Sequence, residues 1–145
     1  MKKIVCLSFC FIIISSCKVF KKSQPNAEAN NLQKLIIQDK YIPAKGNAPY
    51  SILEGSIEKD VLTLIVQYGG GCKEHFFELY SNGLFLKKIP PRLNLFLEHK
   101  PNEDFCRKLV VDTLTFDLLN GRFPNKEKGY EIEIDSYSNI LHYKY

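Results

Sequence analysis

The stretch that decides the fold class is Leu62-Thr-Leu-Ile-Val-Gln-Tyr68. Its even-numbered positions are all apolar or aromatic, whereas Thr63 and Gln67 occupy odd positions and Ile65 is the exception. Successive side chains of a β-strand point to opposite faces of the sheet. The alternation therefore predicts a strand with one face in a core and the other face in water.

The same alternation recurs along the chain, and turn-forming residues separate the runs. About seven short strands at this spacing predict an all-β fold. We expect an antiparallel β-sandwich, immunoglobulin-like, or a small barrel, built from residues 32–145. The other strand-like runs are Glu74–Tyr80, Leu93–His99, Thr113–Leu118, Tyr130–Asp135 and Leu141–Tyr145. The turn-forming segments are Gly69–Gly71, Asn82-Gly83, Pro90-Pro91, Lys100–Asn102, Asn120-Gly121 and Ser136–Asn139.

Two segments allow more specific predictions. Asn82-Gly83 lies between two apolar runs, and this dipeptide is a strong short-range signal for a β-hairpin. Leu32–Lys40 carries apolar residues at helical spacing. The same residues could equally form an edge strand, so both alternatives stay open for this segment.

The first sixteen residues have the three parts of a secretion signal. Lys2-Lys3 supplies positive charge, Ile4–Ile14 is an apolar run, and Ser15-Ser16 places small residues before Cys17. A membrane-spanning helix needs about 20 apolar residues, so this run is too short for a permanent anchor. We therefore expect residues 1–16 to be a lipoprotein signal peptide that leaves the protein.

The run Ile14-Ser-Ser-Cys17 resembles a lipobox, the recognition motif of bacterial lipoproteins. The resemblance implies a diacylglyceryl group on the Cys17 thiol, cleavage before this residue, and acylation of the new amine, for example with palmitate. A single acyl chain anchors a protein only marginally, so stable anchoring needs two or more chains. The alternative is an ordinary signal peptide that leaves Cys17 as a free thiol, but the small residues of an ordinary cleavage site are otherwise missing.

The segment that follows the anchor reads as a tether. Residues 17–31 begin with Cys17 and continue with a polar stretch that contains Pro25 and shows no period. Such composition is typical of a flexible linker. Without the signal, the chain has a formal net charge of +2, which is too small and too dispersed to predict nucleic-acid binding.

Two cysteines and two histidines form the one constellation that could carry chemistry. His75 begins one predicted strand and His99 ends another, and each shares a face with apolar residues. If these strands are antiparallel neighbours, both imidazoles point inward at the same end of the sandwich. Cys72 lies three residues before His75, and Cys106 lies seven residues after His99. All four residues can therefore converge at one pole.

Three hypotheses fit this pole. A Cys72–Cys106 disulfide suits an oxidising compartment, and closing a loop of about 35 residues would contribute about 3.8 kcal/mol through chain entropy. A zinc site formed by Cys72, His75, His99 and Cys106 is the alternative, although its spacing lacks the tight second pair of finger motifs. In the third hypothesis the thiols are unlinked and the histidines are ordinary core residues. The compartment favours the disulfide and no cofactor.

The sequence lacks the motifs of the common enzyme classes. Gly69–Lys73 does not have the spacing of a phosphate-binding loop, and no G-x-S-x-G elbow occurs. Glu103 and Asp104 lie near His99, but no serine completes a triad with them. We expect no catalytic residues and no enzymatic activity, with a small hydrolase that uses an unrecognised site as the lesser alternative.

Part of the chain resembles the C-terminal β-sandwich of NigD-like lipoproteins. The resemblance rests on Tyr68–Tyr80, Pro90-Pro91, Leu93–His99 and Asn102–Cys106, and its most specific parts are the Gly-Gly-Cys-x-x-His element and the later His–Cys element. It implies a β-sandwich on the cell envelope, with no established activity. This chain has little room for a separate N-terminal domain before Tyr41, so a function carried by such a domain is not implied.

These observations predict a lipid-anchored protein of the bacterial cell envelope, located at the outer membrane. We expect it to be non-enzymatic and to act by binding a protein or a ligand. Its expected partners are the membrane, through Cys17, and an unidentified envelope protein or ligand. A metal-binding module formed by Cys72, His75, His99 and Cys106 is the alternative function.

The lipobox generates the first testable prediction. Cys17→Ala removes the sulfur that would carry the diacylglyceryl group, so the variant should incorporate no labelled palmitate. It should also leave the membrane fraction or accumulate as a precursor. Unchanged palmitate labelling of Cys17→Ala would contradict the lipobox interpretation.

Overall fold

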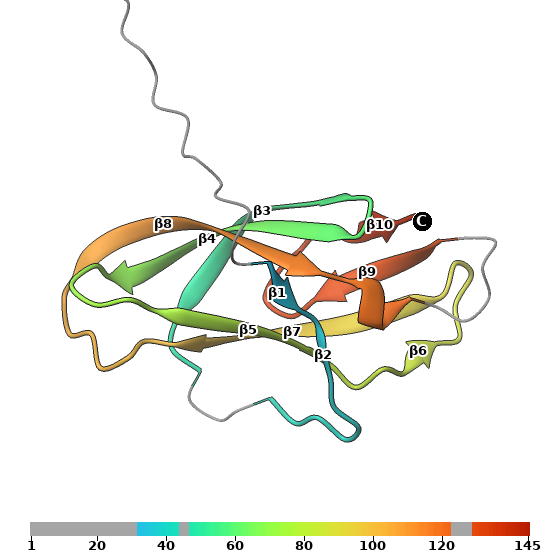
Figure 1. Cartoon of the computed structure of the whole chain (residues 1–145), viewed down its shortest axis with the longest axis horizontal. Coiled ribbons are helices and arrows are strands. Elements are labelled where there is room, and N and C mark those ends of the chain that lie inside the picture. The colour runs from blue at the N-terminus through green and yellow to red at the C-terminus, as the bar shows by residue number, and fades with distance from the viewer. Residues whose placement is uncertain (1–31, 44–46, 123–128) are drawn as a thin grey trace, which may run out of the picture.

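A computed structural model describes residues 32–43, 47–122 and 129–145, and the predicted signal peptide, Cys17 and tether lie outside these ranges. Two β-sheets are stacked face to face, as Figure 1 shows from the side. Apart from one short 3₁₀ helix, η1 (Leu119–Gly121), the described elements are all strands. The predicted all-β sandwich is confirmed.

The first sheet has four strands in the order β1-β8-β4-β3. β4 is antiparallel to both of its neighbours, whereas β1 runs parallel to β8 at its far edge. The bounds are β1 (Gln33–Lys34), β3 (Tyr50–Glu58), β4 (Val61–Gly70) and β8 (Lys108–Asp117).

The second sheet has the order β10-β9-β7-β5-β2, with β6 paired to β7. β7 is antiparallel to β5 but parallel to β9, and β2 is parallel to β5. The bounds are β2 (Ile36–Ile37), β5 (Phe76–Ser81), β6 (Phe85–Leu86), β7 (Arg92–Lys100), β9 (Tyr130–Ile134) and β10 (Leu141–Tyr143).

The expectation of purely antiparallel sheets was wrong, because both sheets are mixed. Between β7 and β9 the chain crosses to the first sheet, forms β8, and returns. This double crossing lets β9 run in the same direction as β7, whereas a direct hairpin would have made them antiparallel. Across the described residues the sheets remain two separate layers, so the small-barrel alternative was wrong as well.

The core lies between the two sheets and follows the alternation of the sequence. Every second residue of β4 is buried from Leu62 to Gly70, and β7 buries the alternate residues from Leu93 to His99. Apolar burial contributes about 25 cal/mol per Å², so this layer is the main source of stability. Its fully buried members include Leu62, Leu64, Leu79, Leu93, Leu95, Leu97, Phe116, Leu118, Tyr130, Ile132 and Tyr143.

The segment that starts the described chain forms two edge strands, so the helical alternative for Leu32–Lys40 was wrong. β1 joins the first sheet and β2 joins the second, and the chain passes between the layers at Leu35. The Leu35 side chain is buried and its amide donates to Asp117 O at 3.0 Å. Each strand covers only two residues of its neighbour.

Two further local predictions need correction. Gly83 has a φ of +70°, but Asn82-Gly83 does not reverse the chain, because β5 and the following strand β6 are both antiparallel to β7 and therefore run in the same direction. It is therefore not the turn of a hairpin with β5. β3 was missed because a bulge between Ile52 and Glu54 interrupts its alternation.

Within the described ranges, no helix has the length and apolar character that crossing a bilayer requires.

The alternation generates a stability prediction with a matched control. Leu64 is fully buried in β4, whereas the neighbouring Thr63 faces the outer side of the sheet and is half-buried. Leu64→Lys should lower the free energy of unfolding by on the order of 4 kcal/mol, because it places an unpaired charge in the core. Thr63→Lys should change it by less than about 0.5 kcal/mol. Chemical denaturation measures both, and equal effects would contradict the assignment of faces.

Candidate functional site

The four predicted pole residues do lie at one end of the sandwich, at the left of Figure 1, where β4 and β7 end and β5 and β8 begin. Phe77 pairs with His99 across β5 and β7, and His75 comes just before β5. Both histidines point inward, with exposed fractions of 9% for His75 and 4% for His99. The inward orientation that parity predicted for both imidazoles is therefore observed.

Cys72 and Cys106 lie beside the histidines at disulfide distance. Their Cα atoms are 5.9 Å apart, and they are 34 residues apart in sequence. Cys72 follows β4 and Cys106 precedes β8, which are antiparallel neighbours in the first sheet. This is the geometry that the disulfide hypothesis requires.

The two imidazoles form a row of polar contacts with Asp104. His75 Nδ1 lies 2.7 Å from His99 Nε2, and His75 Nε2 lies 3.3 Å from Asp104 Oδ2. At the other end of this row, His99 Nδ1 lies 3.2 Å from the carbonyl oxygen of Ala48. The side chain of Asp104 is only 1% exposed, so the whole row of polar contacts is shielded from water.

Asp104 is the acceptor that ties two loops together. Its Oδ2 accepts hydrogen bonds from the amides of Cys72 at 2.8 Å and Lys73 at 2.9 Å, and its Oδ1 accepts one from the amide of Cys106 at 2.9 Å. The amides of Lys73 and Cys106 are the largest causes that hold the pKa of Asp104 well below its usual range. The carboxylate is therefore ionised in the folded protein.

The positions of the hydrogen atoms along this row of contacts follow from which groups can donate and which can accept. A carbonyl and an ionised carboxylate can only accept, so His99 Nδ1 and His75 Nε2 must donate at the two ends. The contact between the rings needs one further hydrogen. The two imidazoles together then carry three hydrogens, which gives the pair one positive charge beside the negative Asp104. Burial is the main cause that lowers the pKa of His99.

Aromatic rings enclose the histidine pair. Tyr68 stacks on His75 with ring centroids 4.6 Å apart, and Phe77 stacks on His99 at 4.4 Å with an interplanar angle of 1°. Tyr50 meets His99 edge-on at 6.0 Å. Stacking against an electron-rich face favours a cationic ring over a neutral one. The surroundings therefore stabilise the charge that the hydrogen-bond pattern places on the pair.

Gly70 is required for this arrangement. A Cβ atom built on Gly70 would lie 2.5 Å from His75 Nε2 and 3.1 Å from Asp104 Oδ2. Any side chain would therefore separate the His75–Asp104 pair. The neighbouring Gly69 has nothing within 4 Å of the same position.

The pole does not arrange the predicted Cys₂His₂ ligands around one point. Among the described residues, the ligand atoms that lie within 4.8 Å of one another belong to Cys72, Asp104 and Cys106. The facing nitrogens of His75 and His99 are directed at each other. A metal would need both sulfurs as thiolates, so the zinc hypothesis stays a prediction that chemical analysis can test.

The sequence did not single out Asp104 as the centre of the site. From the sequence, Asp104 stands out only as a candidate member of a catalytic triad. One signal was available: aspartate often accepts a hydrogen bond from the amide two residues later in a turn, and Asp104 does this with Cys106. Its bonds to Cys72 and Lys73 cross more than thirty residues and leave no local trace.

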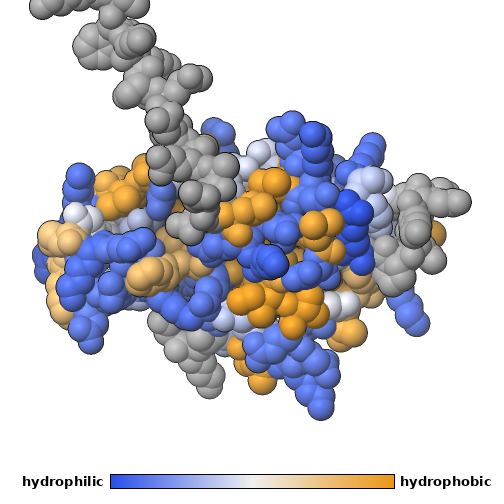
Figure 2. Space-filling view, viewed as in Figure 1, coloured by the Kyte–Doolittle hydropathy of each residue, from blue (hydrophilic) through white to orange (hydrophobic). Residues whose placement is uncertain are grey.

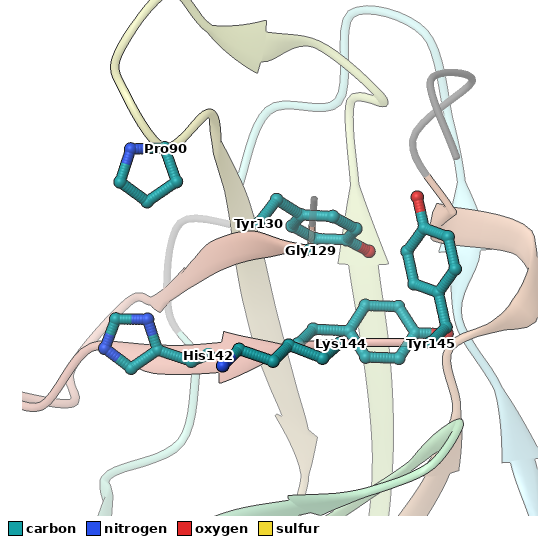
Figure 3. A pocket seen from close by; sticks show the side chains of 7 residues that line it. Pro90, Gly129, Tyr130, His142, Lys144 and Tyr145 are labelled. Carbon is teal, nitrogen blue, oxygen red and sulfur yellow. The ribbon is translucent and has the colours of Figure 1, made fainter. Parts of the chain in front are cut away.

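A second region of interest is a groove at the opposite end of the second sheet. It has a volume of about 420 Å³ and lies between the Pro90 turn, the start of β9 and the strand β10. Figure 3 shows the rings of Tyr130 and Tyr145 along it, with His142 and Lys144 projecting from one strand segment. The alternation of the sequence places these tyrosines on strand faces but does not indicate a groove.

Polar contacts hold the wall of the groove. The hydroxyl of Tyr130 donates to Gly121 O at 2.6 Å, and that of Tyr143 donates to Asp60. Burial is the largest cause that raises the pKa of Tyr143, to about 12. The guanidinium of Arg122 bonds Asp60 and lies 4.9 Å above the ring centre of Tyr145. The aromatic wall is therefore pre-formed.

Comparison with known proteins places the fold. No family model and no curated protein matches the sequence. The solved structures that are similar to this chain include the following three. A NigD-like immunity protein from Bacteroides caccae has a TM-score of 0.54 and 17% identity, over 71% of this chain and 52% of that one. A Parabacteroides distasonis protein designated toxin-related has 0.55 and 17%, over 79% and 62%. A protein of unknown function from Bacteroides vulgatus has 0.54 and 18%, over 79% and 56%.

At these identities the similarity establishes the fold alone. The expected likeness to NigD-like lipoproteins is confirmed at that level. The chain spans between 52% and 62% of the length of these three proteins.

Mass spectrometry tests whether the sulfur atoms of Cys72 and Cys106 are joined by a disulfide bond. We predict that the exported protein yields a Cys72–Cys106 linked peptide, lighter by the two hydrogen atoms that oxidation removes. Reduction should then lower the free energy of unfolding by about 2–4 kcal/mol. Free thiols with stoichiometric zinc, lost on His75→Ala or His99→Ala, would establish the metal site instead.

Gly70 offers a prediction with its own control next to it. Gly70→Ala should lower the free energy of unfolding by about 1–3 kcal/mol, because the new methyl group would separate the His75 ring from the ionised Asp104 carboxylate and break their hydrogen bond. Gly69→Ala should change it by less than about 0.5 kcal/mol. The ring-nitrogen NMR signals of His75 should shift in Gly70→Ala alone. Similar behaviour of the two variants would contradict the proposed role of the His75–Asp104 contact.

Proposed function

We propose that this protein is a lipid-anchored, non-enzymatic component of the bacterial envelope that binds a protein partner through the groove beside Pro90. The observation that carries the proposal is the contrast between its two polar regions. The His75–His99–Asp104 cluster is buried, whereas the groove opens to solvent between the Pro90 turn and β10.

The buried cluster supports a structural rather than a catalytic role. Each ring nitrogen of His75 and His99 has a contact within the cluster or with Ala48. A general base must reach the proton that it removes, directly or through one water. The aromatic rings of Tyr68 and Phe77 stand against the imidazoles in the place that a substrate would need.

The groove has the composition of a protein-binding surface. Tyrosine is enriched at the centres of interfaces, where its ring gives contact area at a low cost in conformational entropy. His142 and Lys144 are exposed on the same wall. None of the described residues that line the groove is an aspartate or a glutamate. The chemistry therefore favours an acidic segment of a partner protein.

The envelope location rests on the lipobox at Cys17, with the outer membrane as the membrane we propose. The fold similarity to a NigD-like immunity protein supports a role in binding another protein. A metal-binding module at the Cys/His pole and a small hydrolase remain the alternatives. The sulfur and zinc measurements given above separate the first alternative from the proposal, and activity profiling separates the second.

The test is site-specific photo-crosslinking in intact cells that export the full chain. A photoreactive residue at His142, in the groove, should form a covalent adduct with one defined protein. The same residue at Lys59, an exposed site in the turn between β3 and β4, should not form this adduct. Lys144→Glu should remove the adduct because it reverses the charge that the acidic segment meets, whereas Lys59→Glu should leave it unchanged.

Identical adducts from both positions, or an adduct at His142 that survives Lys144→Glu, would overturn the groove as the binding site.

A further inference from the structure

The first sheet has an open edge along most of β8. Among the described residues, β1 pairs with β8 only at Phe116 and Asp117, the last two residues of that strand. The preceding part, Lys108–Thr115, pairs with β4 on one side and with no described strand on the other. Figure 1 shows β8 continuing well beyond the short β1. An uncovered strand edge is a template for pairing with another chain.

The hydrogen bonds at the end of β8 show which backbone groups face this edge. The amide of Leu118 donates to Asp60 O toward β4, and the carbonyl of Asp117 accepts from the amide of Leu35 toward β1. The N–H and C=O of one strand residue point to the same side and alternate along the strand. The pairing of β8 with β4 has no register shift. The backbone groups of Leu109 and Val111 therefore face the open edge.

The side chains along this edge are apolar and exposed. Leu109 is 65% exposed and Val111 is 58% exposed. Figure 2 shows hydrophobic surface over the part of β8 near the cysteine pole. A natural edge strand is usually protected by charges, proline or a bulge, and Leu109-Val-Val111 has none of these.

Two unpaired charges of opposite sign flank the apolar residues. Lys108 precedes Leu109 and Asp112 follows Val111. Within the described ranges neither forms an ion pair within 4.0 Å. The Asp112 carboxylate accepts a hydrogen bond from the amide of Thr113 at 2.7 Å. By occupying the amide of Thr113, Asp112 also ends the edge that is available for pairing.

We propose that this edge pairs with the β8 edge of a second copy of the chain. The sequence Lys108-Leu-Val-Val-Asp112 is self-complementary in an antiparallel arrangement with a two-fold axis at Val110. Each Lys108 then lies opposite Asp112 of the other copy, and each Leu109 lies opposite Val111. The first sheets of the two copies join into one continuous sheet.

The parity of the backbone groups agrees with this register. Antiparallel residues exchange two hydrogen bonds when the groups of both face the partner strand. Leu109 and Val111 both face outward, so the two Leu109–Val111 pairs of the dimer supply four main-chain hydrogen bonds. Val110 lies opposite itself as a pair without hydrogen bonds, for which the Cα separation is about 4.5 Å. A register shifted by one residue would pair outward groups with inward ones and lose these bonds.

The first test measures the mass of the full-length protein in mild detergent by analytical ultracentrifugation. The native protein should be in a concentration-dependent equilibrium with a dimer. Asp112→Lys or Lys108→Asp should each weaken dimerisation about tenfold, because both opposite-charge pairs become like-charge pairs. The double variant Lys108→Asp/Asp112→Lys should restore it. A strictly monomeric native protein, or a double variant as weak as the single ones, would overturn the proposal.

The second test does not depend on charge. Val110→Cys places two thiols opposite each other within the Cα range of a disulfide, about 4.4–6.8 Å. In membranes from cells that export the full chain, mild oxidation should convert this variant to a disulfide-linked dimer. Thr113→Cys is exposed on the same strand, but its two copies are six residues out of register and should not link. Monomeric Val110→Cys with a native unfolding temperature, or equal linking of both variants, would contradict the register.

Discussion

The constraint on which the rest of the structure depends is the single apolar layer that the two sheets share. Each long strand has one apolar face, and a shift by one residue would bring its polar face into the core. Burial therefore sets the register of neighbouring strands. Phe77 lies opposite His99 for this reason, and the same register brings His75 to the same end of the layer. The polar site is a consequence of how the core is packed.

Asp104 satisfies the polar groups that the core buries at this end. Two buried imidazoles that face each other must satisfy four ring nitrogens, and an unpaired buried charge is costly. The Asp104 carboxylate supplies both an acceptor for His75 and a compensating charge. It also binds the amides of Cys72 and Cys106, so the same two loops are joined by hydrogen bonds and by the contact of their sulfurs.

The surfaces that we propose for recognition, in contrast, are ones that the core leaves open. The groove beside Pro90 belongs to the second sheet and offers tyrosine rings with positive charge. The open edge of β8 belongs to the first sheet and offers backbone groups between two opposite charges. The two surfaces share no residue, so self-association through β8 and binding of a partner in the groove are compatible in one molecule.

The sequence by itself determined the faces of the long strands, because the direction of a side chain in a strand depends only on its position in the alternation. This is why β4, β7 and the inward orientation of His75 and His99 could be predicted. It could not determine that β7 and β9 are parallel, that a bulge at Ile52 hides β3, or that Asp104 joins Cys72 to His75. Those features arise from contacts between residues far apart in the chain, which only the packed tertiary structure brings together.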